Sequence, residues 1–574
     1  MIVLPHAIGT PKTGATPAAE SSLDAESQAP IALAFITAAV AVSTVGVLLG
    51  LLASRAGAQG APGPALERGG FAIVRGSDTI VTERFVRGPA ALQGSLRIRG
   101  APRQDYFVTL GPGEVVQSFT LSAWMPGAAD SAPPAQRIPM TVAGDTVIAQ
   151  TPAGTRRIPT RFGAVPVLNN SFALIEIFTR RARATGGSGE FPFFATAGGQ
   201  TLPATVTAVG ADSAVFTVAG QANRLAVDAV GRILGGTVGP FRVVRLGPEA
   251  AAGMTLAPPP DVKVAPPDYS APPAAPYTAE DVRVPGPHGI TLGGTLTKPK
   301  GAGPFPAIVT ITGSGQQDRD EFIPLAGGIR LFRQVADTLG RRGIAVLRLD
   351  DRGLGASTGD ATTSTTADFA DDIRAAVAYL RTRKDIDGAR IGLLGHSEGG
   401  VIAPMVAATD PGVRAIILLA GTASNGLEII KAQQRYAIDH MPGLTPSQRD
   451  SARVAVERQL VVTAGSNPWM HFFIDYDPAT TARKVKAPTL IVQGATDRQV
   501  PASEAEKLAA LIRSGGNTDV TVRVLPNVNH LFLADTSGDF AKYSSLPTNV
   551  VGPAVLGVIA DWAAQKLGTP GVKP

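Results

Sequence analysis

The chain has 574 residues, no cysteine and a formal net charge of +6, with 44% hydrophobic and 17% charged residues. Because a single core rarely grows past roughly 250–300 residues, the length predicts more than one domain, and the composition excludes wholesale disorder. The lack of cysteine excludes disulfides, thiolate zinc sites, iron–sulfur clusters and a cysteine nucleophile. The positive charge is too sparse to predict a nucleic-acid partner. Its densest cluster, Arg180, Arg181 and Arg183, is expected to be a solvated strand end.

Residues 1–58 form a predicted leader. Residues 31–52 carry no charge, and Ala56, Gly57 and Ala58 follow as a small-x-small pattern like that of a signal-peptidase site. The apolar stretch is longer than an ordinary signal core and could span a bilayer, and no basic cluster precedes it. We therefore expect export to the periplasm or the extracellular space. A membrane anchor through 31–52 is the second interpretation, and a buried core helix is the third.

Residues 69–248 alternate apolar and polar side chains between closely spaced turn residues, as in the runs 79–86 and 116–121. This period of two predicts an antiparallel all-β domain, either a sandwich or a partly open barrel, with no helix and no catalytic group. The proline-rich segment 258–276 is expected to be a semi-rigid linker, because such a run sustains neither a helix nor a central strand. The linker predicts that the β domain folds as a separate unit.

Residues 278–568 change to alternating strands and helices. After a hairpin around 287–289, apolar strands are expected at 307–312, 344–349, 391–394, 415–420, 489–493 and 520–525, and helices at 330–339 and 369–380. Continuous apolar strands between amphipathic helices predict an α/β fold with a mostly parallel sheet covered on both faces. Residues 422–486 interrupt the alternation with helical segments, and we expect this insertion to be a helical lid.

A G-x-S-x-G pattern, 395–399, directly follows an apolar strand and precedes a helix. That context is required for a nucleophile elbow, whose tight turn excludes side chains two positions from Ser397. The serine oxygen would then stand at the strand's carboxyl end, over a helix N-terminus that favours developing negative charge. A plain strand–turn–helix is the alternative for the pattern alone.

Asp497 and His530 are expected to complete a catalytic triad with Ser397. Each follows one of the later strands, and the order serine, aspartate, histidine at successive strand ends is that of the α/β-hydrolases. The other histidines lie in the leader, before the first parallel strand, inside the elbow or in the insertion: His6, His288, His396, His440 and His471. In this scheme His530 takes the Ser397 proton, Asp497 orients the imidazole, and water hydrolyses an acyl-enzyme. A turn aspartate and a surface-loop histidine are the alternatives.

The oxyanion hole needs two N–H donors. One is expected from Glu398, the residue after the nucleophile. The other is expected from the turn after strand 307–312, at Ser314 or, as the second choice, at Gly315. Glycines in this turn allow the backbone to approach a substrate.

Aromatic residues of the insertion are expected in part to line the acyl pocket: Trp469, Phe472 and Phe473, with Met470 and Tyr476. The alternative is that they only pack the insertion onto the sheet. The insertion offers Glu428, Glu457 and Asp475 singly, without the adjacent pair that would capture a substrate amine. We therefore expect esters of short to medium acyl chains as substrates.

Residues 278–568 resemble the α/β-hydrolase superfamily and, more narrowly, bacterial serine carboxylesterases that carry an N-terminal β domain. The resemblance rests on the runs 313–320, 351–357 and 395–400 and on the loops of Asp497 and His530, and the stretch 469–478 is similar to the esterase lid. It implies hydrolysis of small-molecule esters without a cofactor. Thr312 stands where many lipases have a histidine, which argues against a lipase-type oxyanion loop. The run 351–357 is expected to be a structural turn.

Three other functions stay open. Serine peptidases related to prolyl oligopeptidases share this triad order, but the β domain is too short for seven propeller blades of about 40–45 residues each. Thioesterases and acyltransferases share the acyl-enzyme. A non-catalytic binding protein would have little reason to keep the serine, aspartate, histidine and oxyanion glycines together.

Overall fold

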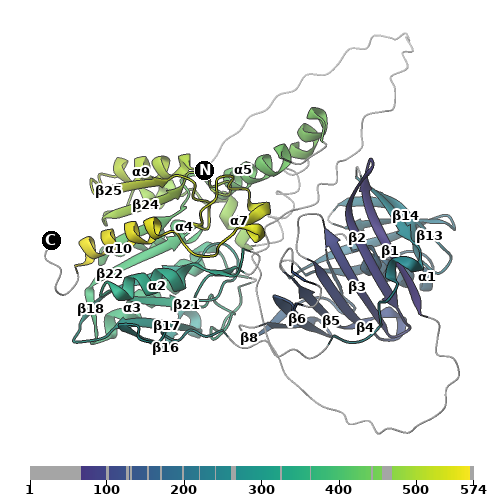
Figure 1. Ribbon diagram of the computed structural model, residues 1–574, viewed down its shortest axis with the longest axis horizontal. Helices are drawn as coiled ribbons and strands as arrows, with labels where there is room; N and C mark the ends of the chain where they lie inside the picture. Colours follow the sequence, from purple (N-terminus) through teal and green to yellow (C-terminus); the bar gives the residue numbers. More distant parts are fainter. Residues whose placement is uncertain are drawn as a thin grey trace, which may run out of the picture.

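The computed structural model describes residues 66–568 apart from 99–102, 125–127, 130–131, 152–153, 169–170, 197–198, 219, 240, 260–266, 324–325, 362, 441–443 and 455–467. The predicted leader therefore lies outside the described residues, as do parts of the linker and of the insertion. Figure 1 shows a body of broad strands built by the first half of the chain and a body of strands and helices built by the second half. No helix in the described ranges is long and apolar enough to cross a membrane.

The N-terminal body is one sheet of 15 strands. These are β1 (Glu67–Arg75), β2 (Asp78–Arg87), β3 (Ala91–Ile98), β4 (Gln104–Leu110), β5 (Val116–Ala123), β6 (Gln136–Ala143), β7 (Thr146–Thr151), β8 (Gly154–Pro159), β9 (Val165–Val167), β10 (Gly189–Ala195), β11 (Gln200–Val209), β12 (Ser213–Val218), β13 (Gln221–Val227), β14 (Ile233–Val238) and β15 (Phe241–Leu246). The order is β8 back to β1, then β15 back to β9, and neighbours are antiparallel except β9 and β10. Such a single sheet with β8 and β9 at its ends fits a partly open barrel rather than a sandwich.

A helix, α1 (Phe172–Ala184), packs into this sheet, so the expectation of a domain without helices is wrong. The hydroxyl of Ser171 caps the helix by accepting a hydrogen bond from the Leu174 N–H. Apolar side chains of α1 share one buried core with those of the strands. The buried residues Leu174, Ile177, Phe178 and Ala182 recur at helical spacing. The expectation missed this signal because α1 is one short helix within a long series of strands.

The cluster of arginines near residue 180 belongs to α1 and is not a solvated strand end. Arg180 pairs with Glu67 at 2.6 Å and with the buried Glu176 at 2.9 Å. Arg245 of β15 pairs with the same two carboxylates, at 2.6 and 2.7 Å. Arg180 and Arg245 therefore neutralise acidic groups of the β domain, whereas Arg181 and Arg183 donate to the carbonyls of Gly163 and Ala211 at 2.7 and 2.9 Å.

The C-terminal body holds an eight-stranded sheet. Its strands are β16 (Tyr277–Pro285), β17 (Thr291–Pro299), β18 (Phe305–Ile311), β21 (Ala345–Leu349), β22 (Ile386–His396), β23 (Val413–Leu419), β24 (Thr489–Gly494) and β25 (Val520–Leu525), and a separate pair is formed by β19 (Phe322–Ile323) and β20 (Ile329–Arg330). The order is β16-β17-β21-β18-β22-β23-β24-β25. The first two pairings are antiparallel and the other five are parallel. The strand ends that carry Ser397, Asp497 and His530 therefore face the same edge.

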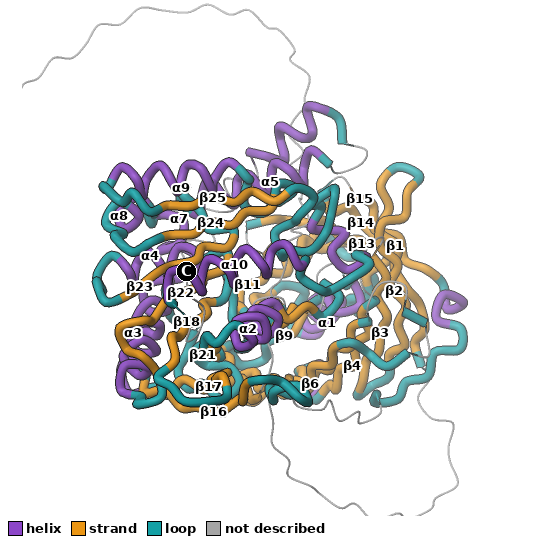
Figure 2. Tube along the Cα trace, turned by 60° about the vertical axis from the view of Figure 1, so that its left-hand side comes forward, coloured by secondary structure: helices purple, strands orange, loops and turns teal. Residues whose placement is uncertain are grey.

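Helices cover both faces of this sheet (Figure 2). They are α2 (Leu331–Arg341), α3 (Thr366–Thr382), α4 (Gly399–Ala407), α5 (Gly426–Asp439), α7 (Pro468–Asp475), α8 (Ala479–Ala482), α9 (Ser503–Ser514) and α10 (Pro553–Leu567), with 3-10 turns η1 (Pro112–Glu114), η2 (Pro248–Ala251), η3 (Pro287–Gly289) and η4 (Phe540–Ser545) elsewhere in the chain. The apolar sides of α3, α4 and α9 join one core, and those of α2 and α10 join the other. The predicted α/β fold is thus confirmed.

The described part of the linker is bound to the C-terminal body. The Tyr269 hydroxyl donates to Asp318 at 3.1 Å, and its ring lies 4.2 Å from the Arg319 guanidinium. Arg333 of α2 donates to the carbonyls of Asp268 and Ser270 at 2.6 and 2.9 Å. The linker therefore contributes to the C-terminal body as well as joining the two.

Candidate active site

Ser397 stands in a strained turn between β22 and α4. Its φ is +54°, in the left-handed region that most side chains avoid, and its N–H donates to the Leu419 carbonyl at 2.8 Å. A Cβ atom at Gly395 would lie 1.9 Å from the Gly399 carbonyl oxygen, and one at Gly399 would lie 2.2 Å from the Ile311 oxygen. Both flanking positions therefore require glycine, and the turn leaves the Ser397 side chain half-buried.

Asp497 and His530 lie together in the structure. The Nδ1–H of His530 donates to Asp497 Oδ2 at 2.8 Å, and both side chains are buried. Asp497 Oδ1 accepts the N–H groups of Gln499 and Val500 at 2.8 and 2.9 Å, and Oδ2 also accepts from Gln493 at 2.9 Å. This set of donors fixes the carboxylate, which in turn fixes the imidazole.

The turn after β18 lies directly against Ser397. A Cβ atom at Gly313 would approach the Ser397 Cβ to 3.2 Å. The Gly313 N–H donates to Glu321 Oε1 at 3.0 Å, whereas Ser314 is half-buried and Gly315 is exposed with a φ of +89°. The turn that is predicted to bind the oxyanion therefore lies next to Ser397. Because the Gly313 N–H is already bonded to Glu321, the next N–H along the chain is that of Ser314.

The run 351–357 supports this turn. Asp351 accepts hydrogen bonds from the Thr312 hydroxyl and the Gln317 N–H, both at 2.7 Å, and thereby ties together the two ends of the turn. Burial raises the pKa of Asp351 well above its usual range. Arg352 in the same run holds Asp372 of α3 at 2.8 Å. These contacts are structural and do not reach the serine.

Comparisons with known proteins find hydrolases that are similar to the C-terminal region. The family described as serine aminopeptidase, S33, matches residues 326–537, which include Ser397, Asp497 and His530. An esterase, EstD, from Thermotoga maritima is 28% identical over 52% of this chain and 70% of that protein. A monoacylglycerol lipase from Mycolicibacterium smegmatis is 26% identical over 35% of this chain and 75% of that protein. A solved Pyrococcus furiosus esterase has 16% identity and a TM-score of 0.38 over 52% of this chain and 96% of its own.

The C-terminal region is an α/β-hydrolase. Its sheet order and the esterase relatives together confirm the resemblance that the sequence motifs indicate. The family and the two relatives indicate that this region catalyses a hydrolysis.

His396, the residue before Ser397, is buried with both ring nitrogens next to oxygen atoms. Its Nδ1 lies 2.7 Å from Glu321 Oε1, and its Nε2 donates to the His530 carbonyl at 3.0 Å. Each ring nitrogen faces an oxygen atom, so each contact needs a proton between the nitrogen and the oxygen. His396 and Glu321 together therefore hold one proton more than a neutral imidazole and a carboxylate would. Burial lowers the pKa of His396, but the charge and hydrogen bond of Glu321 outweigh burial and raise that pKa above its ordinary value.

Glu398 of the hydrolase region has a buried side chain as well as the N–H that the sequence singled out. One oxygen, Oε1, accepts the Thr366 hydroxyl at 2.7 Å and the Trp469 indole N–H at 2.8 Å. Burial raises the pKa of this carboxyl, and hydrogen bonds from Thr366, Trp469 and the Ser314 hydroxyl oppose that rise. Sequence patterns could not reveal this role, because the elbow motif concerns only the backbone at this position.

The three aromatic residues expected at the acyl pocket fall into two groups in the structure, Trp469 with Phe473 and Phe472 apart from them. Trp469 donates to Glu398, the residue after Ser397. Phe472 packs against the hydrolase core. Phe473 stacks on Trp469 with ring centroids 5.1 Å apart and lies against Gly426 at the start of α5. Packing of the insertion onto the sheet therefore accounts for Phe472.

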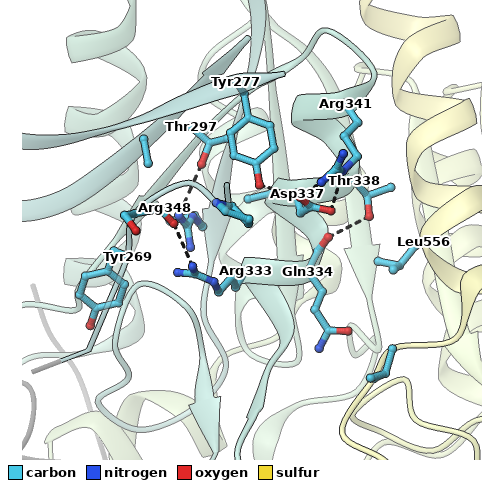
Figure 3. Close-up of a pocket in the computed structure, with 15 residues that line it drawn as sticks. Tyr269, Tyr277, Thr297, Arg333, Gln334, Asp337, Thr338, Arg341, Arg348 and Leu556 are labelled. Carbon is cyan, nitrogen blue, oxygen red and sulfur yellow. Dashed lines mark hydrogen bonds and ion pairs between the residues drawn. The ribbon is translucent and has the colours of Figure 1, made fainter. Parts of the chain in front are cut away.

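A cavity of about 450 Å³ lies under the linker, between α2 and strands β16, β17 and β21 (Figure 3). Tyr269, Tyr277 and Arg348 line it, and none of the predicted site residues does. Its arginines bind the protein itself: Arg341, for instance, pairs with Asp337 at 2.9 Å. The cavity is therefore separate from the serine. Within the described ranges, no group of histidines and carboxylates is arranged to hold a metal ion.

Proposed function

We propose that the hydrolase region is a serine carboxylesterase that cleaves esters through an acyl-enzyme, with Ser397, Asp497 and His530 as its catalytic triad. The observation that carries the proposal is the 2.8 Å hydrogen bond between Asp497 and His530, together with the glycine-flanked turn that carries Ser397 at the end of β22. The His530 carbonyl is itself bound by His396, the residue that precedes the serine. These contacts hold the triad loops to one another.

Proton transfer follows from the tautomer that Asp497 imposes. Since His530 donates through Nδ1, its Nε2 keeps the lone pair that can accept the Ser397 proton. The serine oxygen forms a bond to the ester carbonyl carbon, and His530 then returns the proton to the departing alcohol. Water, deprotonated by His530, attacks the acyl-enzyme and releases the acid and free Ser397.

The negative oxygen of each tetrahedral intermediate requires donors that are already in place. We assign the N–H groups of Glu398 and Ser314 to this role. The Gly313 N–H is occupied by Glu321 at 3.0 Å, which favours Ser314 as the donor from the turn. Gly315 remains the second choice.

Ester substrates are favoured over substrates with a free amino group. The carboxyl nearest the nucleophile, Glu398, is buried and already accepts hydrogen bonds from Thr366 and Trp469. Asp475, on the aromatic helix α7, is exposed and lies 3.3 Å from His471. The relatives EstD, an esterase, and the monoacylglycerol lipase support ester hydrolysis. An aminopeptidase is the second candidate, because the matching family carries that description.

The test is kcat/KM on matched nitrophenyl acyl esters, acyl thioesters and aminoacyl nitroanilides. We expect aryl and alkyl esters of short to medium chains to be the best substrates, with little cleavage of amides. An apolar wall gains roughly 0.8 kcal/mol per buried methylene, so charged acyl groups should be disfavoured. A preference for aminoacyl amides would transfer the assignment to a peptidase.

We also propose that the protein is exported, because an uncharged stretch, 31–52, precedes the small-x-small pattern at 56–58. N-terminal sequencing of the mature protein should then begin at or near Gln59. If the protein is instead recovered in the membrane fraction with residues 31–52 intact, this segment is a membrane anchor and not a cleaved export signal.

A further inference from the structure

We propose that Glu321 and His396 form a positioning pair for the catalytic centre. The pair holds two segments in a fixed relation to Ser397: the turn 312–315, here called the oxyanion turn, and the loop of His530. This inference rests on the proposed function, because it takes Ser397 as the nucleophile and His530 as the base. It gives a role in the reaction to two buried side chains that the triad mechanism does not use.

Three hydrogen bonds run in series through this pair. The Gly313 N–H donates to Glu321 Oε1 at 3.0 Å, and the same oxygen lies 2.7 Å from His396 Nδ1. At the other end, His396 Nε2 donates to the His530 carbonyl at 3.0 Å. Because His396 ends β22 and directly precedes Ser397, the series connects the oxyanion turn and the histidine loop through the strand that carries the serine.

The two ends of the series fix the protons inside it. A main-chain N–H can only donate and a carbonyl can only accept, so Glu321 Oε1 accepts at one end and His396 Nε2 carries a proton at the other. A proton must also lie between Nδ1 and Oε1, because two lone pairs 2.7 Å apart would repel each other. Glu321 is 0% exposed and His396 is 2% exposed, so water does not replace either partner. The removal of either member therefore breaks the whole series.

Glu321 is held in this place in a strained and incompletely bonded state. Its φ is +54°, and its second oxygen, Oε2, is buried without a hydrogen-bond partner in the described ranges. Its N–H donates to the Asp318 carbonyl at 2.8 Å, and the Asp318 side chain accepts the Phe322 N–H at 3.0 Å, so the surrounding chain fixes the turn. Strain of this kind persists only where neighbours impose it, and it clusters at functional sites. The arrangement favours the placement of Oε1 over the stability of the fold.

At the oxyanion turn, the pair determines which N–H group is available. A Cβ atom at Gly313 would lie 3.2 Å from Glu321 Oε1 and 3.2 Å from the Ser397 Cβ, so the turn is packed between these two side chains. Since the Gly313 N–H is occupied, Ser314 presents the next one. An oxyanion hole acts by being assembled before the reaction. A small displacement of this turn should therefore lower kcat more than it raises KM.

At the histidine loop, the pair gives the proposed base a second anchor. The side chain of His530 is held by Asp497 at 2.8 Å, whereas its main chain is held by His396. The rings of His396 and His530 lie 4.8 Å apart, and Phe532 of the same loop packs edge-on against His396 with centroids 5.9 Å apart. Two anchors on one residue restrict the direction of its imidazole. We expect the loss of the main-chain anchor to slow proton transfer even though the bond to Asp497 remains.

Kinetics per active site test the pair without changing the triad. A fluorophosphonate probe titrates the reactive Ser397, so kcat can be expressed per titrated serine and misfolded protein does not contribute. Glu321→Ala and His396→Ala should each lower this kcat roughly 10- to 100-fold with little change in KM. Affinity for a boronic acid that mimics the tetrahedral intermediate should fall in parallel. Because the two residues act in series, the double variant should lose no more than the worse single variant.

A conservative variant and a control refine this test. Glu321→Gln keeps an acceptor for the Gly313 N–H and should lose less of kcat than Glu321→Ala. Asp372→Asn is the matched control, because Asp372 is a buried carboxylate of the same region that bonds Arg352 and does not reach the serine. It should lower Tm and leave kcat per titrated serine unchanged.

A second cycle applies if Glu321→Ala does not fold. It consists of Glu321→Gln, His396→Gln and their double variant. Each single variant should still lower kcat several-fold, because an uncharged pair cannot satisfy all three hydrogen bonds. The double variant should again lose no more than the worse single variant.

The outcomes separate this inference from the proposed function. An unchanged kcat per titrated serine in the single variants, or independent, multiplicative losses in the cycle, would overturn the positioning role. In both cases Ser397 would still be labelled by the probe, and Ser397→Ala would still be inactive. Failure of the probe to label Ser397, together with full activity of Ser397→Ala, would instead overturn the proposed function.

Discussion

Both the β domain and the hydrolase region bury carboxylates, but they satisfy them differently. In the β domain Glu83 is fully buried and accepts four hydrogen bonds: from the Tyr106 and Ser171 hydroxyls at one oxygen, and from the N–H groups of Phe172 and Ala173 at the other. The last two donors begin helix α1, whose N-terminus favours a negative charge. Glu83 is therefore a complete structural site.

In the hydrolase region Glu321 is equally buried, yet only Oε1 is bonded, to Gly313 and His396. Its Oε2 is buried without a hydrogen-bond partner in the described part of the chain. The backbone at Glu321 is also in the left-handed region, with a φ of +54°. Burial of a charge thus does not by itself mark a functional site. What distinguishes Glu321 from Glu83 is its strained backbone and its unbonded oxygen, together with its bond to the turn that lies against Ser397.

The largest effect should come from Ser397→Ala. It should reduce kcat by on the order of 10³-fold or more, while Tm stays unchanged, because the side chain makes no structural contribution to the turn. His530→Ala should lose a similar factor and Asp497→Asn somewhat less. Steady-state kinetics with thermal unfolding of the same samples measures both quantities. Near-normal turnover by Ser397→Ala would refute the assignment, and full activity of His530→Ala would show that another histidine is the base.

Glu83→Ala should give the opposite pattern, a loss of stability without a loss of turnover. Removing the carboxylate leaves four buried donors without an acceptor, and each such group costs about 1–3 kcal/mol. We expect the free energy of unfolding of the β domain to fall by roughly 3 kcal/mol or more. Urea unfolding followed by signals from the β domain, beside kcat per folded molecule, checks this. Glu83→Gln keeps an acceptor and should therefore lose less stability than Glu83→Ala. A large drop in kcat of folded Glu83→Ala would contradict the purely structural role of Glu83.

Glu321→Gln should change how stability depends on pH. Because the folded-state pKa of His396 is raised above its ordinary value of 6.5, the pair contributes stability that is fully present below about pH 6.5. That contribution is lost as the pH rises through the folded-state pKa. In Glu321→Gln the neutral amide can bond a neutral imidazole, so this slope should disappear. The Tm of the two proteins should therefore differ most at low pH and converge on the alkaline side; a constant difference would exclude the shared proton.

The sequence predicts the hydrolase region well because its strands have one physical signature. Strands such as β18 and β24 are buried along their whole length, so they form uninterrupted apolar runs, and parallel order then brings their carboxyl ends together. That rule and the elbow motif alone lead to Ser397, Asp497 and His530 as the proposed triad. In the structure His530 and Asp497 are hydrogen-bonded at 2.8 Å.

Other features depend on tertiary contacts that leave no local signal. Glu321 carries no motif and meets His396 only because its turn comes next to the end of β22. The side-chain role of Glu398 depends on Trp469, which is far away in the sequence. Each of these required the fold before its chemistry could be recognised.

The smallest effect should come from Tyr269→Phe, which tests whether the linker belongs to the hydrolase region. The change removes one hydrogen bond, to Asp318, and keeps the ring over Arg319. Asp318 also accepts the N–H groups of Asp320 and Phe322, and thus supports the segment that carries Glu321 to Gly313. A single hydrogen bond contributes about 1 kcal/mol, so we expect a small loss of stability confined to the unfolding transition of the hydrolase region.

A variant starting at Thr278 lacks Tyr269 altogether and should lose at least as much stability. Identical hydrolase transitions in all three proteins would show that the linker only tethers the β domain; a shift in Tyr269→Phe would show that the catalytic unit begins before β16.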